Sequence, residues 1–133
     1  TDLDSNVLEK AQKGVYTAAN VNGLDATHLK RWFLKSKDGE HYKVKDTLRE
    51  RIAFKRLNLL QDWPMKGPFD LILCRNVVIY FDKETKDHLF KRYANILSDH
   101  GYLFLGHSES MSKEHSNYKN LGKTMYQLRA HAG

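Results

Sequence analysis

The pattern of apolar and polar positions predicts helices and strands that alternate along the chain. Residues 69–74 and 102–105 form nearly continuous apolar runs, which are typical of strands buried in a parallel sheet. Between them, apolar residues at helical spacing over 89–97 predict one buried face of a helix that starts at Asp82. Residues 124–128 could add one more strand. The alternation indicates an α/β fold with an open, mostly parallel, doubly wound sheet.

The first part of the chain begins with two helices whose ends are marked by capping residues. Asp4 or Ser5 can cap a helix that Gly14 is placed to end. Asp25 caps a second helical stretch, in which apolar side chains recur at helical spacing over residues 29–33. We therefore expect two helices before residue 35.

Between residues 35 and 56 the helical pattern gives way to short alternating segments. Asp38 and Gly39 form a hairpin-type turn signal, and polar and apolar positions alternate over 41–45 and 50–55. These features predict two or three short antiparallel strands, which form a small β-subdomain inserted at about 35–56. A turn is also expected at residues 99–101, directly before the apolar run at 102–105.

Size and composition set limits on the class of protein. The chain has 133 residues, 41% of them hydrophobic, which is enough for one domain or most of one. The longest apolar run, at residues 77–81, is far shorter than the roughly 18–20 residues of a membrane helix, so no membrane insertion is expected. The single cysteine, Cys74, cannot form an internal disulfide, which favours a reducing, cytoplasmic location.

The net charge of +6 is unevenly distributed along the chain. Residues 30–56 hold ten Lys or Arg residues against four acids. Such a stretch attracts an acidic protein, a nucleic acid or an anionic membrane surface, and it is equally compatible with a solvated face. Few aromatic residues are interleaved with these charges, which argues against a platform for stacking single-stranded bases.

Polar residues that directly follow the predicted strands are candidates for binding, because ligands of such sheets lie outside the carboxyl ends of the strands. Asp2 could accept from both ribose hydroxyls, and Asn58 offers the donor and acceptor that an adenine edge requires. Arg75 cannot lose its charge and must find an anion or carbonyl groups. Residues 106–109 follow the second apolar run. Tyr80, taken alone, is typical of a core aromatic residue.

Other chemistries find little support in the sequence. The seven histidines are scattered and lack a cysteine partner, so no metal site is expected. The sequence Gly-His-Ser-Glu-Ser at 106–110 is not the Gly-x-Ser-x-Gly elbow of a hydrolase. A glycine-rich phosphate loop of the Walker type is also missing from the sequence.

Four segments of the chain, taken together and in order, carry a family resemblance. The most specific are FDLILCRNVVIYFD at residues 69–82 and GYLFLGHSES at 101–110; the others lie at 1–16 and at 31–33 together with 58–60. Together they resemble the CheR-type chemotaxis receptor methyltransferases. The resemblance extends from residue 1 to about 128. It implies the C-terminal portion of a class I, Rossmann-like domain that binds S-adenosylmethionine.

The resemblance also implies an activity, a partner and a set of site residues. The activity is that of a protein-glutamate O-methyltransferase, which moves a methyl group from S-adenosylmethionine to the cytoplasmic domain of chemotaxis receptors and leaves S-adenosylhomocysteine. Carried over by position, Asp2 would hold the ribose, Asn58 and Leu59 the adenine, and Cys74 and Arg75 the amino-acid end of the cofactor. Arg75 and Tyr80 would be the catalytic pair, and the basic β-subdomain would contact the receptor.

The matched segments begin after the glycine-containing first strand and loop of that family and after its N-terminal helical domain. We therefore expect a piece of a longer protein, inactive by itself, with an exposed sheet edge on which a second copy could pair. The turn at residues 38–39 is shorter than the loop with which some family members hold a receptor tether, which argues against tether binding.

The sequence is also compatible with two alternative functions. One is a non-catalytic, methyltransferase-like binding module in chemosensory signalling. The other is a nucleic-acid methyltransferase, but such amino-methylating enzymes usually carry Asn/Asp-Pro-Pro-aromatic after the strand that ends here at Cys74. This chain has Cys-Arg-Asn at that place, so we expect no nucleic-acid partner.

Overall fold

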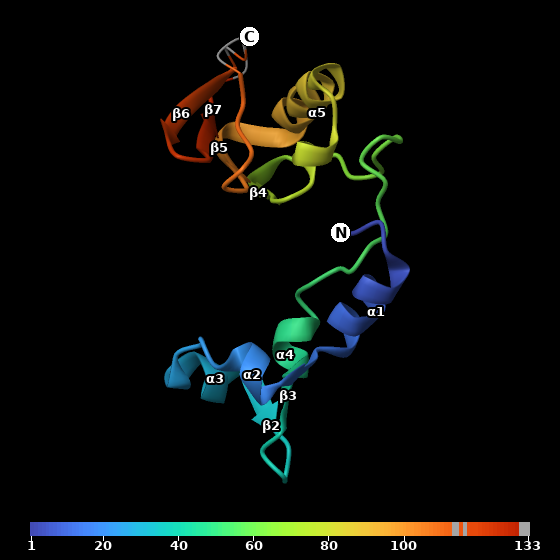
Figure 1. Ribbon diagram of the computed structural model, residues 1–133, viewed down its shortest axis with the longest axis vertical. Coiled ribbons are helices and arrows are strands. Elements are labelled where there is room, and N and C mark those ends of the chain that lie inside the picture. Colours follow the sequence, from blue (N-terminus) through green and yellow to red (C-terminus); the bar gives the residue numbers. More distant parts are fainter. Residues whose placement is uncertain (113–114, 116, 131–133) are drawn as a thin grey trace. The chain divides into compact units, whose positions relative to one another are not determined.

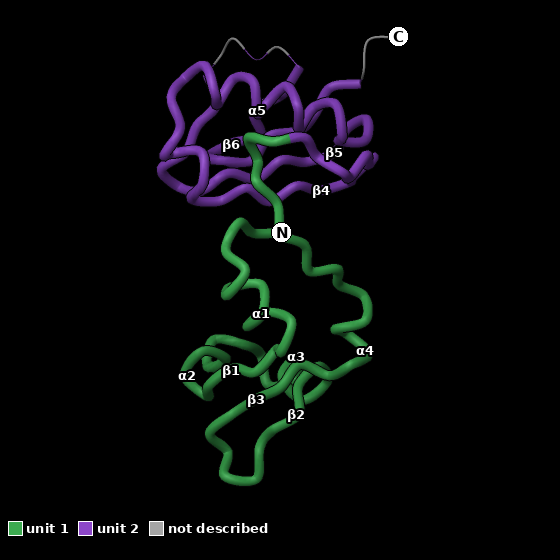
Figure 2. The backbone as a smooth tube through the Cα atoms, turned by 90° about the vertical axis from the view of Figure 1, so that its right-hand side faces the viewer, with its two compact units in different colours: residues 1–61 green, residues 62–133 purple. Residues whose placement is uncertain are grey.

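The computed structural model describes residues 1–112, 115 and 117–130. The chain forms two compact units, residues 1–61 and residues 62–133 (Figure 2). Each unit has its own secondary structure and its own small sheet. No helix among the described residues is long and apolar enough to cross a membrane.

The first unit combines short helices with a three-stranded antiparallel sheet (Figure 1). Its helices are α1 (Ser5–Lys13), α2 (Ala18–Val21), α3 (Ala26–Trp32) and α4 (Asp46–Arg49). Its strands are β1 (Val15–Thr17), β2 (Phe33–Lys35) and β3 (His41–Val44). The order is β1-β3-β2, so that β3 is the central strand and pairs antiparallel with both neighbours.

The predicted starts of α1 and α3 and the predicted end of α1 are confirmed, whereas α2 was not predicted and Phe33, expected in the second helix, begins β2. The Asp4 carboxylate accepts from the backbone N–H of Asn6 at 2.8 Å at the start of α1. Gly14 ends this helix in the left-handed conformation with φ 65°, which favours glycine. Asp25 caps α3 in the same way and accepts from the N–H of Thr27. Both capping residues satisfy N–H groups that the helix itself leaves without a partner.

The antiparallel sheet is confirmed, but its strands differ from the prediction. The β2–β3 hairpin turns through the predicted Asp38-Gly39 pair, and Gly39 has φ 76°. The third strand comes from β1, at residues 15–17, and not from residues 50–55. The prediction of a strand at 50–55 is wrong. Its polar and apolar side chains alternate, but no described strand pairs with its backbone. Arg49 instead ties the end of α4 to α1, where its Nε donates to the Gln12 carbonyl at 3.0 Å.

The second unit is a mixed sheet with one long helix (Figure 1). Its strands are β4 (Phe69–Cys74), β5 (Leu97–Leu105), β6 (Tyr118–Gly122) and β7 (Met125–Leu128), and its helices are α5 (Lys83–Ile96) and the 3-10 helix η1 (Val78–Tyr80). The order is β4-β5-β7-β6. The β4–β5 pair is parallel, whereas β5–β7 and β6–β7 are antiparallel. The predicted α/β class is confirmed. The sheet of this unit is mixed and not mostly parallel, because among its described strands only β4 and β5 pair in parallel.

The core of the second unit lies between α5 and one face of the sheet. Leu89, Phe90 and Tyr93 of α5 are each less than 5% exposed, and Leu103 of β5 is fully buried. Asp82 caps α5 as predicted, since its carboxylate accepts from the Thr85 N–H at 2.8 Å. A hydrogen bond with the Thr85 side chain, together with this backbone bond, lowers the pKa of the Asp82 carboxyl.

Hydrogen bonds join α5 to the two edge strands of the sheet, β6 and β4. The Tyr118 hydroxyl of β6 donates to the Phe90 carbonyl at 2.6 Å, and the Tyr93 hydroxyl donates to Cys74 Sγ at 3.1 Å. On β4, by contrast, Leu71 and Leu73 are 50% and 66% exposed. Residues 69–74 therefore form the predicted strand, but it is an edge strand with one uncovered face.

The turn predicted at residues 99–101 is part of β5 in the structure. The pairing with β4 nevertheless breaks there, because Phe69 pairs with Leu97 and Leu71 pairs with Tyr102. The intervening residues form a bulge in which His100 has φ 62°. Gly101 fits because a Cβ at this position would lie 2.9 Å from the Ser98 carbonyl oxygen. The predicted break in the chain thus occurs within a strand and not between two elements.

Candidate functional site

The carboxyl ends of β4 and β5 lie at one edge of the second sheet. Cys74 pairs with Leu105 at the end of this parallel pair. Because both strands run in the same direction, the residues that follow them, 75–80 and 106–109, leave the sheet at the same edge. Together with Cys74, the last residue of β4, these two segments contain the candidate residues that the sequence predicts for this unit.

A single buried carboxylate joins the two segments. Glu109 is 3% exposed. Its Oε2 accepts from the backbone N–H groups of Val77, Val78 and Ile79, at 3.1, 2.7 and 3.2 Å. Its Oε1 accepts from the N–H groups of Asn76 and Gly106. The carboxylate therefore satisfies five backbone donors, four of them from the segment that follows β4.

The backbone after β4 forms a concavity that is suited to an anion. Asn76 has φ 59° in the left-handed region, and the next residue, Val77, is in the right-handed helical region. Successive residues of opposite hand turn their N–H groups toward one point, which makes an anion-binding nest. Here the occupant of the nest is the carboxylate of Glu109.

Cys74 is packed beneath this loop as a protonated thiol. It is 5% exposed, and burial raises the pKa of its thiol. The hydrogen bond from Tyr93 opposes this rise in the pKa, and the charge of Glu109 adds a smaller increase. Burial likewise raises the pKa of Tyr93 and the pKa of Tyr118. A thiol with a raised pKa is a poor nucleophile at neutral pH. Cys74 can therefore line a binding site but is unsuited to covalent catalysis.

Arg75 and Tyr80 are exposed at the two ends of the same loop. Tyr80 is 80% exposed, although it follows an apolar run and its neighbour Val78 is 1% exposed. The interpretation of Tyr80 as a core aromatic residue is therefore wrong. The short helix η1 turns Val78 into the core and leaves the Tyr80 ring in solvent, where it can meet a ligand.

Asp2 and Asn58 lie close together in the first unit. Asp2 forms an isolated parallel bridge with Arg56, in which the Leu57 N–H donates to the Asp2 carbonyl at 2.9 Å. The Asp2 carboxylate is exposed and accepts from the Asp4 N–H at 2.9 Å. Asn58 follows the bridge, and its side-chain oxygen accepts from the Leu60 N–H at 3.0 Å. The two predicted residues thus sit at the ends of adjacent parallel segments.

The candidate residues fall into two groups, one in each unit. Asp2, Asn58 and the half-buried Leu59 belong to the first, while the loop of Cys74, Arg75 and Tyr80 belongs to the second. Sequence reasoning noted Glu109 only as one of several polar residues after a strand. The signal that could have identified it is an acid three residues after Gly106, in a segment expected to end beside the β4 loop.

A parallel strand pair with polar loops at its carboxyl edge, covered by a helix and accompanied by a small antiparallel sheet, is the arrangement of a class I, Rossmann-like methyltransferase fold. The family model described as "CheR methyltransferase, SAM binding domain" matches residues 1–127. The chain belongs to this family. The resemblance of the four segments to CheR-type proteins is confirmed, and the family description names S-adenosylmethionine as the cofactor.

Curated relatives of the chain are described as chemotaxis protein methyltransferases. The chain is 40% identical over 132 residues to a chemotaxis protein methyltransferase of Klebsiella aerogenes, an alignment that covers 96% of this chain and 45% of the relative. It is 38% identical over 132 residues to that of Escherichia coli, covering 96% and 46%. A probable chemotaxis protein methyltransferase of Rhizobium etli is 37% identical over 129 residues, covering 95% and 48%. The chain therefore spans about half the length of the curated relatives it matches.

Proposed function

We propose that the protein to which this chain belongs transfers a methyl group from S-adenosylmethionine to glutamate side chains of chemotaxis receptors. The observation that carries this proposal is the loop after β4, which exposes Arg75 and Tyr80 at the edge where ligands of such sheets bind. Family membership and the names of the relatives support a methyltransferase that acts in chemotaxis. The receptor and its glutamates are the finer part of the proposal.

The residues present fit the proposed cofactor. Asp2 has an exposed carboxylate at the end of a bridged segment, and ribose hydroxyls could donate to it. Asn58 and Leu59 follow the adjacent segment, where an amide and an apolar side chain suit an adenine ring. Cys74 and Arg75 would border the amino-acid end. We assign no ligand to the amides of 76–79, because Glu109 already accepts from them.

The proposed reaction needs little acid–base chemistry from the protein. The carboxyl group of a free glutamate has a pKa of about 4.3, so at neutral pH it is already the nucleophile. The cofactor supplies an electrophilic methyl group. The protein then has to hold the carboxylate in line with that group, and such orientation contributes up to about 7–11 kcal/mol. Arg75 can pair with the carboxylate, and the Tyr80 hydroxyl can donate to it.

Arg75→Ala is expected to lower kcat/KM for receptor methylation about 100-fold, and Tyr80→Phe about 10-fold, because each removes a donor aimed at the reacting carboxylate. The measurement is transfer of radiolabelled methyl groups to a receptor cytoplasmic domain by the full-length protein. Arg129→Ala and Tyr102→Phe are matched controls at exposed positions outside the loop. Values within about twofold of wild type for Arg75→Ala and Tyr80→Phe would exclude the proposed roles.

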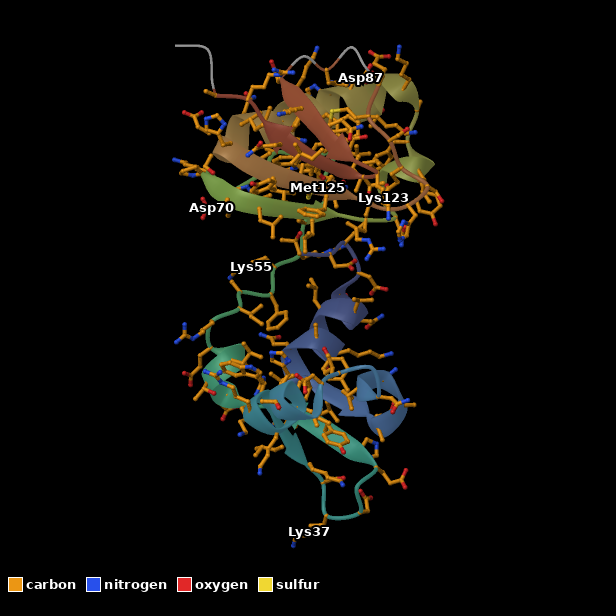
Figure 3. All side chains as sticks on the ribbon, turned by 90° about the vertical axis from the view of Figure 1, so that its left-hand side faces the viewer. Lys37, Lys55, Asp70, Asp87, Lys123 and Met125 are labelled. Carbon is orange, nitrogen blue, oxygen red and sulfur yellow. The ribbon has the colours of Figure 1, made fainter. Side chains whose placement is uncertain are left out.

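The basic stretch supports an acidic partner such as a glutamate-rich receptor helix. Residues 30–56 carry ten Lys or Arg residues against four acids, and they include β2, β3 and the hairpin between them. Lys37 extends from the tip of this hairpin (Figure 3). Complementary charge of this kind accelerates encounter and fixes orientation more than it adds affinity.

We further propose that residues 1–133 hold only part of the cofactor site and that the rest of the longer protein completes it. The support is that the chain spans under half of each relative described above. Isothermal calorimetry of S-adenosylmethionine with residues 1–133 should accordingly show no binding with a Kd below about 100 μM. The full-length protein should bind the cofactor at least tenfold more tightly. Equal affinities for the two would contradict the proposal. Tight binding without methyl transfer would favour a binding module instead.

A further inference from the structure

We propose that Glu109 is a positioning residue for the proposed methyl transfer: its carboxylate holds the loop that carries Arg75 and Tyr80. This inference rests on the proposed function, although its structural half can be tested separately. Glu109 does not extend toward the exposed edge, since it is 3% exposed. It acts on the site through the backbone of residues 76–79, to which it is bound by four hydrogen bonds.

Only a group that accepts at both oxygens fits this place. Oε1 faces two N–H donors and Oε2 faces three. A glutamine would replace one of these oxygens by an NH₂ group, which donates and would face two or three other donors. The size of the side chain is nearly unchanged by this substitution. Glu109→Gln therefore removes the acceptor while leaving the packing almost intact.

The carboxylate is itself held in place by its own segment. The Glu109 N–H donates to the Gly106 carbonyl at 3.0 Å, and the Gly106 N–H donates back to Oε1 at 2.7 Å. This closed turn follows β5 directly, so the end of β5 fixes Glu109. Glu109 in turn fixes the end of β4. The position of the loop is thus set by two paired strands and not by the loop sequence alone.

The anchored backbone decides where the two exposed side chains lie. Asn76 is in the left-handed region, which is unfavourable for a non-glycine residue unless other contacts stabilise it. The bonds to Glu109 supply that stabilisation. They also bind the N–H groups of Val78 and Ile79, at the start of η1, which ends at Tyr80. Without the carboxylate, the backbone between Arg75 and Tyr80 could relax, and both side chains would lose their fixed separation.

The structural half is tested by amide hydrogen exchange in the full-length protein, comparing Glu109→Gln with wild type. Amides of residues 76–79 should exchange at least tenfold faster in the variant, while the amides of Tyr93 in α5 and Leu103 in β5 keep their protection. Glu84→Gln, at an exposed position of α5, is the matched control and should change neither set. Unchanged exchange at 76–79 would overturn the proposal. Loss of protection throughout α5 and β5 would also overturn it, because Glu109 would then serve the folding of the whole unit.

The functional half is tested by kinetics of the same variants. Glu109→Gln should lower kcat about 30-fold and change KM for S-adenosylmethionine less than threefold, because the proposed ribose and adenine contacts are made by other residues. Glu109→Asp, which keeps both acceptor oxygens on a shorter side chain, should recover part of the loss. If Glu109 acts through Tyr80, the double variant with Tyr80→Phe should be little slower than Glu109→Gln alone.

The outcomes separate this inference from the proposed function. Fully additive losses in the double variant would overturn the positioning role while leaving the methyltransferase proposal in place. A wild-type protein that methylates no receptor domain would overturn the proposed function alone. In that case accelerated exchange at 76–79 in Glu109→Gln would still support the anchoring of the loop.

Discussion

Phe90→Ala is expected to lower the free energy of unfolding of the second unit by about 3–5 kcal/mol. The Phe90 side chain is 1% exposed, and its ring meets His115 edge-on, with centroids 5.3 Å apart. Truncation would remove this volume from between α5 and the sheet and leave a cavity that rigid neighbours fill only in part. Urea unfolding can be followed by the fluorescence of Trp63, which stacks on Tyr93 in the same unit. A Trp32→Phe background removes the signal of the first unit.

Leu73→Ala is the matched control for this prediction. Leu73 is also apolar and lies in β4, the first strand of the parallel pair, but its side chain is 66% exposed. Its truncation in residues 1–133 should change the free energy of unfolding by about 0.5 kcal/mol or less. Equal losses for Phe90→Ala and Leu73→Ala would mean that the core does not lie between α5 and the sheet.

Elements with local causes were predicted well from the sequence. The starts of α1, α3 and α5 depend on capping carboxylates that act within two or three residues, at Asp4, Asp25 and Asp82. The strand at 69–74 depends on a continuous apolar run. Such features need no knowledge of distant partners, so a single sequence contains the information that decides them.

Elements decided by distant pairing were predicted poorly. Residues 15–17 form β1 because β3 lies beside them, whereas the better alternation at 50–55 forms no strand. Strand β6 was missed as well, and it exists through its pairing with β7. The turn predicted at 99–101 became a bulge because β5 continues along β4 on both sides of it. In each case the neighbouring strand, and not the local pattern, decides the conformation.

The candidate site shows the same division between local and distant causes. The positions of Arg75 and Asn58 after their strands follow from the chain order alone. The role of Glu109 does not, because its partners at residues 76–79 lie about 30 positions earlier in the chain. The exposure of Tyr80 was equally inaccessible, since a single turn of η1 separates it from the buried Val78. A sequence therefore indicates which loops meet, but not which side chain holds them together.

Gly106→Ala is expected to destabilise the second unit by about 3 kcal/mol and to expose the amides that Glu109 binds. A Cβ at this position would lie 2.6 Å from Glu109 Oε1 and 2.6 Å from Asn76 Oδ1. Glu109 Oε1 cannot move freely, because it accepts from two backbone N–H groups, and the backbone nitrogen of Asn76 would also lie only 3.0 Å from the added carbon. Relief of the clash would cost about 1–3 kcal/mol in overpacking, and each lost hydrogen bond to the charged carboxylate would add about 1.5–3 kcal/mol before compensation by water.

Gly23→Ala provides the control that separates a close approach from the general effect of replacing glycine. A Cβ at Gly23 would have no atom within 4 Å, and its φ lies outside the left-handed region. This substitution should leave stability unchanged or raise it by up to about 1 kcal/mol, because alanine restricts the unfolded chain. Urea unfolding of both variants gives the comparison. If Gly106→Ala were as stable as Gly23→Ala, the contact of Glu109 with the strand ends would have to be loose, and the carboxylate could not fix the loop.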